Sequence, residues 1–355
     1  MNIKQIAKKA GVSVATVSRV LNHPENVAPA TREKIQKIME QEEYTPNWFA
    51  QGLNFNRTKT IGLLIPQTMN SSNMEIANGI EEVARQKGYI TFICNMEKDA
   101  QIEKNYIDHL IARKVDGLIL MYSSLNDEYM DIINEEKIPT VLIGENEKRQ
   151  NWDSVIVDCR DGAVKMVAHL IECGHKSIGM LCGSDPEQES KAILQGYTNV
   201  LKASGIKLSP DYIVNVENTI QGGYIGTKRM IETMTSQDSG IPGDKVDAIF
   251  ATSDEIAYGA MDAIKDSGLR IPEDIAVAGF GNNKMSNLVE PKLTTVDEPY
   301  RLVGIYGARI LFDLIEEKAA KGDNRKRHTP EHIILKTKMR IRKSCGHKER
   351  IGEMF

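Results

Sequence analysis

The N-terminal stretch IKQIAKKAGVSVATVSRVLN, residues 3–22, predicts two short helices joined by a tight turn. Apolar residues recur at helical spacing in residues 3–10 and again in residues 14–22, which gives each helix one face to bury. Gly11 lies between them and favours the turn, because glycine reaches the left-handed backbone conformation without steric cost. Ser13 is placed to cap the second helix. The pattern is typical of a helix-turn-helix, in which Val17 and Val20 hold the second helix against the first.

The side of the second helix that faces away from the first carries short side chains and one arginine. Such a surface can approach the edges of base pairs closely in the major groove. We therefore expect Val14, Ala15 and Arg19 to face bases. Hydroxyl and amide groups of the same segment are expected to meet phosphates, which positions a protein on DNA without reading its sequence. These residues are Ser13, Thr16, Ser18 and Asn22. An ordinary helical hairpin is the alternative interpretation of this pattern alone.

Charge is distributed unevenly along the chain. Residues 1–59 carry nine lysines and arginines against five aspartates and glutamates, whereas the remaining 296 residues carry 36 against 44. A basic N-terminal region on an acidic remainder suits a protein that touches phosphates with one end only. A third helix is expected from about residue 30 to 42, with Thr31 near its start, where a helix N-terminus favours a phosphate.

Composition restricts the class of protein. The chain has 355 residues, 41% hydrophobic and 26% charged, which predicts a globular protein of two or three units. Neither a membrane-spanning run nor a secretory signal is expected. The five cysteines form no CxxC pair, so we expect reduced, buried thiols in a cytoplasmic protein. Cys345 and His347 lie close together without a second pair of ligands, so no metal site is expected.

From residue 60 the hydrophobic pattern changes to an alternation of apolar strands and helical stretches. This alternation is typical of βαβ units and a parallel sheet. It occurs twice in succession, so we expect two doubly wound parallel sheets. The predicted strands are 61–66, 89–95, 116–122, 139–144 and 155–158 in the first set, and 177–183, 213–216, 248–252 and 275–280 in the second.

Several segments resemble the lactose-repressor (LacI/GalR) family, in the order in which that family has them. They are residues 3–22, VAPATREKI (27–35), YTPNWFAQGL (44–53), IGLLIP (61–66), KVDGLIL (114–120), GHKSIGMLCG (174–183), GLRIPEDIAVAGF (268–280) and PKLTTV (291–296). The segments GFGN (279–282) and MNS (69–71) are also similar to Gram-positive repressors of sucrose-type operons. The resemblance implies a helix-turn-helix headpiece on an α/β core of the periplasmic-binding-protein type.

The same resemblance implies the organisation of the chain. It places a headpiece in residues 1–46, a hinge in 47–59, a core in 60–345 and a tail in 346–355. The first core subdomain is expected to comprise about 60–160 and 294–325, and the second about 161–293 and 326–345. In the family the hinge inserts a leucine into the minor groove of operator DNA, and Leu53 matches that leucine. Asn47, at the start of the hinge, is expected to contact phosphate. Two headpieces on a homodimer then read a pseudopalindromic operator.

The family binds a small-molecule effector between its core subdomains, and this chain departs from the family at several of those positions. Asp161 falls where some members place an acid that bonds a sugar hydroxyl. An expected arginine is Ile193, an expected stacking aromatic is Asn218, and an expected aspartate is Gly281. Amides and carboxylates predominate, so we expect a neutral sugar or oligosaccharide rather than a sugar phosphate, which arginine or lysine would bind. The expected effector residues are Asn70, Asn73, Asp161, Glu187, Glu189, Asn218, Ser253, Asp254 and Asn282.

Three alternatives to a sugar-controlled repressor can be compared with the sequence, and the first of them is also a regulator. Control by a phosphocarrier protein, as in catabolite-control members, stays open because the effector positions are altered. A Rossmann-type enzyme would need a complete glycine fingerprint, and AGFGNN (278–283) lacks the third glycine. A sugar-binding transport protein would carry a signal peptide and no headpiece. The sequence therefore predicts a cytoplasmic repressor of a carbohydrate-utilisation operon, released from DNA by a neutral sugar, with no cofactor and no catalytic activity.

Overall fold

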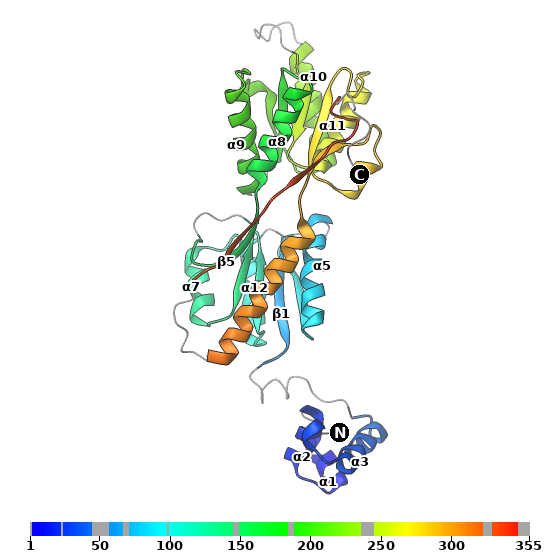
Figure 1. Cartoon of the computed structure of the whole chain (residues 1–355), viewed down its shortest axis with the longest axis vertical. Coiled ribbons are helices and arrows are strands. Elements are labelled where there is room, and N and C mark those ends of the chain that lie inside the picture. The colour runs from blue at the N-terminus through cyan, green and yellow to red at the C-terminus, as the bar shows by residue number, and fades with distance from the viewer. Residues whose placement is uncertain are drawn as a thin grey trace. The chain divides into compact units, whose positions relative to one another are not determined.

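The computed structural model of the chain describes residues 2–22, 24–44, 57–66, 71–97, 99–144, 149–183, 188–235, 245–321 and 329–346 (Figure 1). The chain divides into two units, Met1–Lys59 and Thr60–Phe355, and each is described by itself. Within the described ranges, no helix is long and apolar enough to cross a membrane.

The N-terminal unit is built from helices that share one small core. They are α1 (Ile3–Ala10), α2 (Val14–Asn22), the short 3-10 helix η1 (Pro24–Asn26) and α3 (Pro29–Gln41). The helix α1 ends at Gly11, which has a left-handed φ of 70°, and the Val12 amide donates to the Ala7 carbonyl at 3.1 Å. Val17 is fully buried and Val20 is nearly so. The predicted helix-turn-helix is therefore confirmed.

The first sheet of the second unit is parallel throughout, in the order β11-β5-β4-β3-β1-β2. Its strands are β1 (Thr60–Ile65), β2 (Ile90–Asn95), β3 (Gly117–Met121), β4 (Thr140–Ile143), β5 (Asp153–Val157) and β11 (His332–Leu335). Its helices are α5 (Ser71–Gln86), α6 (Ala100–Ala112), α7 (Asp127–Glu135) and α12 (Tyr300–Lys321). Because successive strand residues point to opposite faces, Leu63 packs in the cluster with α5 and α12, and Leu64 in the cluster with α6 and α7.

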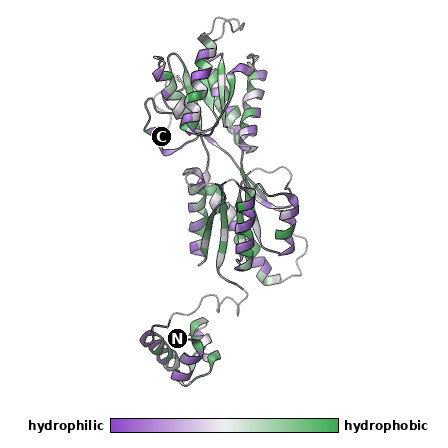
Figure 2. Ribbon diagram, turned by 180° about the vertical axis from the view of Figure 1, so that it is seen from behind, coloured by the Kyte–Doolittle hydropathy of each residue, from purple (hydrophilic) through white to green (hydrophobic). Residues whose placement is uncertain are grey.

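The second sheet has the order β12-β10-β9-β8-β6-β7, and only β12 runs antiparallel to its neighbour among the described strands. Its strands are β6 (Ile178–Gly183), β7 (Ile213–Val216), β8 (Ala248–Ala251), β9 (Ala276–Gly281), β10 (Thr294–Asp297) and β12 (Lys338–Arg340). Its helices are α8 (Cys159–Glu172), α9 (Gln188–Ala203), η2 (Pro210–Tyr212), α10 (Ile220–Thr235), α11 (Asp254–Asp266) and η3 (Lys284–Asn287). In both sheets the central strands are apolar, and the helices turn polar residues outward (Figure 2). The expected pair of α/β subdomains is confirmed.

Glycine allows the helices α5 and α12 to pack closely. A Cβ on Gly79 would lie 2.3 Å from the Arg301 carbonyl oxygen, and one on Gly304 would lie 2.0 Å from that of Ile76. No side chain fits at either distance, so this crossing requires both glycines. The contact matters for the site below because α12 begins there, at Tyr300.

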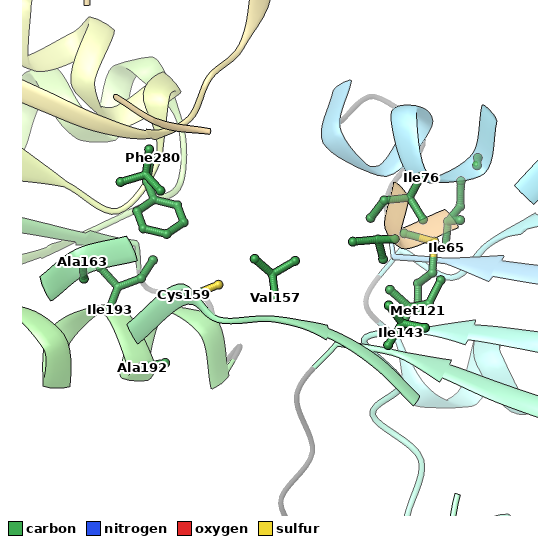
Figure 3. Packing of buried hydrophobic residues seen from close by; sticks show 14 of the residues in the cluster. Ile65, Ile76, Met121, Ile143, Val157, Cys159, Ala163, Ala192, Ile193 and Phe280 are labelled. Carbon is green, nitrogen blue, oxygen red and sulfur yellow. The ribbon is translucent and has the colours of Figure 1, made fainter. Parts of the chain in front are cut away.

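Within the described residues, the chain passes between the sheets three times: from β5 to α8, from β10 to α12 and from β11 to β12. Val157 and Cys159, on the first crossing, lie between two groups of buried side chains that belong to one cluster (Figure 3). An ion pair of 2.6 Å between Lys336 and Asp158 joins the third crossing to the first. The first and third crossings are thus held together where the two sheets meet.

The expected subdomain boundaries are wrong at two strands. Residues 294–297, expected in the first subdomain, form β10 and pair with β9 of the second sheet. Residues 332–335, expected in the second subdomain, form β11 and pair with β5 of the first sheet. Each strand has only four residues. Strand pairing, which the local pattern does not report, decides which sheet such short segments join.

Candidate DNA-contacting face and effector site

The outer face of α2, which we define as Val14, Ala15, Thr16, Ser18 and Arg19, is the part of the headpiece that sequence reasoning assigned to DNA. Val14 is 40% exposed, and Ala15 and Arg19 are exposed as well. Val17 on the opposite side has no exposed surface. The helix therefore presents its short side chains and its one arginine to solvent, in the arrangement that entry into a major groove requires.

Hydroxyl groups at the start of α2 cap the helix. Ser13 Oγ accepts a hydrogen bond from the Thr16 amide at 3.1 Å, and the two hydroxyl oxygens lie 2.9 Å apart. The predicted cap is therefore present. Ser18 and Thr31 are half-buried, with Thr31 in the first turn of α3. The side chain of Asn22, and the residues Asn47 and Leu53 of the expected hinge, lie outside the described residues.

A second group of polar side chains gathers where the crossings meet. We define it as the crossover cluster: Ser72, Tyr122, Cys159, Glu189, Glu298 and Tyr300. The Tyr122 hydroxyl, from the end of β3, donates to Glu189 of α9 at 2.9 Å, and so links the first subdomain to the second. Tyr300 donates to Glu298, and the Cys159 thiol lies 3.7 Å from the same carboxyl group. Ser72 is hydrogen-bonded to Tyr300.

The electrostatics of the crossover cluster are dominated by two neighbouring carboxyl groups. Carboxylate oxygens of Glu189 and Glu298 and the sulfur of Cys159 all lie within 4.8 Å of one another. Burial raises the pKa of Glu298 to about 7, although hydrogen bonds from Tyr300 and Cys159 favour its charged form. Burial, and then the charge of Glu298, raise the pKa of Tyr300 well above its ordinary value. These groups therefore offer both donors and acceptors near neutral pH.

As possible metal ligands, the groups of the crossover cluster are of mixed type. Carboxylate oxygens suit hard cations, whereas a thiolate suits soft ones. The phenol groups of Tyr122 and Tyr300 already satisfy part of the carboxylate lone pairs. The geometry fits a ligand that carries several hydroxyl groups better than it fits an ion.

Some expected effector residues lie at this junction or near strand ends. Glu189 belongs to the crossover cluster. Asp161 is near the start of α8 and forms an ion pair of 2.5 Å with Lys165. Asn218 follows β7 and accepts from the hydroxyl of Ser253, which caps α11, at 2.5 Å. Asn73 of α5 is buried, with 6% of its surface exposed. Asn70 and Glu187 lie outside the described residues.

The side chains of Asp254 and Asn282 are instead hydrogen-bonded to other residues of the chain. The Asp254 carboxylate has no exposed surface and accepts from Thr295 at 2.5 Å, from Ser286 at 2.6 Å and from the Asn283 amide at 2.6 Å. Burial raises its pKa to about 6. All three partners belong to this chain, so Asp254 positions the loop after β9. The Asn283 side chain from that loop accepts from Ser71 of α5 at 2.8 Å, a second link between the subdomains.

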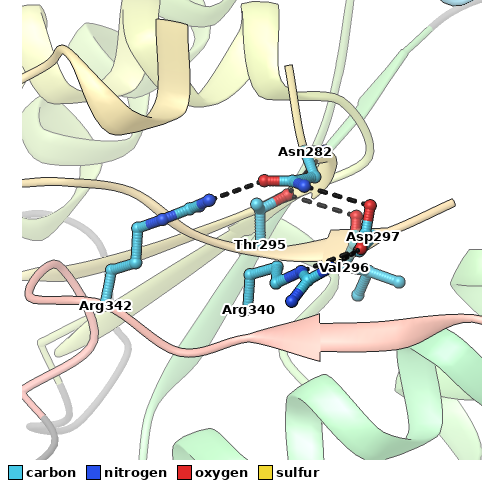
Figure 4. A network of polar contacts seen from close by, with 6 residues as sticks. All are labelled: Asn282, Thr295, Val296, Asp297, Arg340 and Arg342. Carbon is cyan, nitrogen blue, oxygen red and sulfur yellow. Dashed lines mark hydrogen bonds and ion pairs between the residues drawn. The ribbon is translucent and has the colours of Figure 1, made fainter. Parts of the chain in front are cut away.

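The Asn282 side chain is held by charged neighbours. Its amide nitrogen donates to Asp297 at 3.0 Å and its oxygen accepts from Arg342 at 2.7 Å (Figure 4). Arg340 forms an ion pair of 2.7 Å with the same aspartate. This network ties the ends of β9 and β10 to β12 and leaves the Asn282 amide engaged within the chain.

Sequence reasoning missed Tyr122, Cys159, Glu298 and Tyr300. A signal was present, because Tyr122 directly follows β3 and Glu298 directly follows β10, and ligands of parallel α/β sheets bind at the carboxyl ends of strands. Two tyrosines therefore take part in the crossover cluster, beside the amides and carboxylates that predominate among the residues expected from the sequence. Gly281, which stands where an aspartate was expected, lies near the cluster, since a Cβ there would lie 3.3 Å from the Tyr300 hydroxyl.

Two protein-family models match most of the chain. Residues 2–47 match the model of the bacterial regulatory proteins of the lacI family, and residues 58–343 match that of the periplasmic binding proteins and sugar binding domain of the LacI family. Catabolite control protein A of Staphylococcus xylosus is 33% identical over 318 residues, which cover 90% of this chain and 93% of that protein.

Two solved structures are similar over nearly the whole chain. The lac repressor dimer bound to operator and the anti-inducer ONPF has a TM-score of 0.83 at 26% identity, with 97% of this chain and 99% of that chain covered. The transcriptional regulator CelR in complex with cellobiose has a TM-score of 0.71 at 25% identity, with the same coverage. Headpiece, two-sheet core and relatives agree: the chain belongs to the LacI family of DNA-binding transcriptional repressors and carries the family's sugar-binding domain.

Proposed function

We propose that this protein represses a carbohydrate-utilisation operon as a homodimer, and that a neutral sugar bound between the two sheets releases it from its operator. The observation that carries this proposal is the crossover cluster, in which hydroxyl and carboxyl groups from both subdomains converge on the chain crossings. A ligand that engages these groups acts directly on the joint between the subdomains.

The DNA-reading part of the proposal rests on the outer face of α2. Arg19, with Val14 and Ala15 beside it, reads bases, while Ser13, Thr16, Ser18, Asn22, Thr31 and Asn47 contact phosphates. Leu53 wedges into a minor-groove step at the centre of the operator. The structure of the similar lac repressor with its operator supports this mode of binding. Such a repressor works in the cytoplasm, where the chromosome is, and needs no catalytic activity.

The ligand class follows from charge. Glu189 and Glu298 lie close together, so a phosphate group placed between them would meet two groups of like sign. Sugar hydroxyls can donate to these carboxyls and accept from tyrosine hydroxyls, and a tyrosine ring can pack on a sugar face. Asp161, Asn218 and Ser253 extend the polar surface of the second subdomain. The relative CelR, solved with the neutral disaccharide cellobiose, supports a ligand of this class.

Coupling to DNA follows from the two links between subdomains. Tyr122 bonds Glu189, and Ser71 bonds Asn283, so each link joins the first subdomain to the second. A sugar that competes for these groups exchanges one set of contacts for another and thereby favours a different subdomain angle. In a dimer, that change alters the separation of the two hinges and weakens operator binding.

Dimerisation is supported by exposed apolar side chains. Ile90 is 60% exposed and Ile93 is 47% exposed on the edge strand β2, and Leu288 in the second subdomain is 81% exposed. Apolar side chains exposed together on an edge strand are typical of surfaces that pair with another chain. The similar lac repressor was solved as a dimer.

The test begins with selection of the operator from a random DNA library by the purified protein. Fluorescence anisotropy then measures operator binding in the presence of a panel of neutral and phosphorylated mono- and disaccharides. We expect one or more neutral sugars to release the DNA, and Glu298→Ala and Tyr122→Phe to require more sugar for half-release than wild type. Release by phosphorylated compounds alone would contradict the ligand class.

A second candidate function is catabolite control through a phosphorylated carrier protein. The 33% identity to catabolite control protein A favours it. Under this alternative a phosphorylated carrier strengthens operator binding, whereas the neutral sugars have no effect. Adding the carrier with and without its phosphate to the same anisotropy assay separates the two mechanisms.

A further inference from the structure

Three soft metal ligands meet at the end of α8, on the side of the second subdomain away from its start at the crossover cluster. They are His169 and Cys173, one helical turn apart, and Cys345 near the end of the described chain. His169 Nε2 lies 3.4 Å from Cys345 Sγ and 3.6 Å from Cys173 Sγ, and the three ligand atoms all lie within 4.8 Å of one another. His169 and Cys345 are buried and Cys173 is half-buried.

The backbone holds these ligands in place without help from an ion. A separation of four residues puts His169 and Cys173 on one face of the helix. Cys345 follows Ser344, whose carbonyl accepts from the Val277 amide at 2.8 Å and whose hydroxyl donates to the Val277 carbonyl at 2.6 Å. The Cys345 carbonyl lies 3.0 Å from His175 Nε2. The site is therefore preorganised by two elements that strand pairing has already brought together.

The distances match the edges of a metal tetrahedron. Zinc binds sulfur at about 2.3 Å and histidine nitrogen at about 2.0–2.1 Å, so tetrahedral ligands of these types lie roughly 3.6 Å apart. Both nitrogen–sulfur distances agree with this value. Two thiols also converge on one ring nitrogen, which has a single proton or a single lone pair to share. A cation placed among the three groups could accept a lone pair from each of them.

The charges of the three ligand groups also suit a divalent cation. A divalent cation with two thiolates and a neutral imidazole has no net charge, which suits a buried site. Burial, and then the neighbouring Cys345, raise the pKa of the Cys173 thiol to about 12, so a metal ion has to displace its proton. Binding forms one metal–nitrogen and two metal–sulfur bonds and releases two protons, with no change in oxidation state.

We propose that His169, Cys173 and Cys345 form a structural site for a thiophilic divalent cation, with zinc as its occupant and a water molecule as the fourth ligand on the open side of Cys173. The ion fastens the segment after β12 to the end of α8. Because this segment continues the third crossing, the ion stabilises the second subdomain in its folded form.

The experiment uses the full chain without a histidine tag, reduced and freed of metal with a chelator. Equilibrium dialysis against zinc should load one ion per chain, and cobalt in its place should give thiolate charge-transfer absorption and the visible bands of a tetrahedral site. Zinc should raise the melting temperature of wild type. Cys173→Ala should lose the cobalt spectrum and the zinc-dependent shift, while Cys94→Ala, a buried cysteine outside the group, should keep both.

Two results would overturn the site. One is binding of zinc by Cys173→Ala as tightly as by wild type. The other is failure of the reduced wild type to bind zinc, with three titratable thiols rather than five in air-purified protein, which would make Cys173 and Cys345 a disulfide pair. Because Cys173 is half-buried, its alanine variant is expected to fold, and circular dichroism confirms this before the metal is added.

Discussion

The outer face of α2 and the crossover cluster are built in opposite ways. The first is a run of neighbouring residues on one helix, exposed to solvent and pointed outward by the burial of Val17. The second takes its six residues from the starts of helices and the ends of strands across both subdomains, and Glu298 within it is only 8% exposed. A site made by one helix can be read from spacing, whereas a site made by chain crossings needs the fold.

Because the two sites are built differently, mutations in them should have different effects. The headpiece has its own small core and divides from the rest of the chain at Lys59. The crossover cluster lies inside a core that runs through both sheets. Changes in the headpiece should therefore alter DNA binding alone, whereas changes in the cluster should alter both ligand binding and stability.

The largest effect is expected from Val17→Asp, which breaks the headpiece. It places a carboxylate where no solvent reaches and should destabilise the headpiece by more than about 3 kcal/mol. Operator binding should be lost at all sequences, measured by anisotropy, while calorimetry of sugar binding to the core stays unchanged. Normal operator affinity in this variant would show that α2 does not depend on this core.

Glu298→Gln tests the cluster through pH. The folded pKa of about 7 lies above the ordinary 4.5, so the stability linked to its protonation is fully present below about pH 4.5 and is lost as pH rises through about 7. Wild type should lose on the order of 1–3 kcal/mol of unfolding free energy across this window, and the variant should lose less. Urea titrations at several pH values measure this, with the exposed Glu273→Gln as control. If the free energy of unfolding falls equally with pH in all three proteins, the raised pKa does not belong to Glu298.

Arg19→Ala tests whether the outer face of α2 recognises the base sequence of the operator. Loss of the one long donor on the outer face of α2 should weaken specific binding by about 1–3 kcal/mol and relax preference at one base position. Lys37→Ala, which removes an exposed charge from α3, should leave the base preference intact. Gel shifts at fixed salt with operator variants distinguish the two, and identical preferences for wild type and Arg19→Ala would refute the role.

The smallest effect is expected at the cap of α2. Ser13→Ala removes the acceptor for the Thr16 amide and should cost the headpiece about 1 kcal/mol, whereas Ser13→Asn keeps an acceptor and should retain most of the stability. Thermal unfolding of the headpiece followed by circular dichroism measures the difference. If the alanine and asparagine variants unfold at the same temperature, the Ser13 side chain does not stabilise the helix as a cap.

Elements whose signals are local could be predicted from the order of residues alone. Gly11 and Ser13 predict a turn and a helix cap within a few residues. The apolar spacing of residues 14–22 predicts which side of α2 packs inward. The strand predicted at 213–216 coincides with β7. Alternation of strands and helices likewise gave both parallel sheets, because each βαβ unit carries its period within its own thirty or so residues.

The sheet that each short strand joins, and the polar groups that face one another, depend on contacts made in the folded protein. β10 and β11 gain their places from partners far along the chain. Asp254 follows a strand end, as a ligand-binding residue would, yet Thr295 and Ser286 turn it inward. Cys345 meets His169 across 176 positions because strand pairing carries the segment after β12 back to α8. Burial and hydrogen bonding act through space, and local periodicity does not encode them.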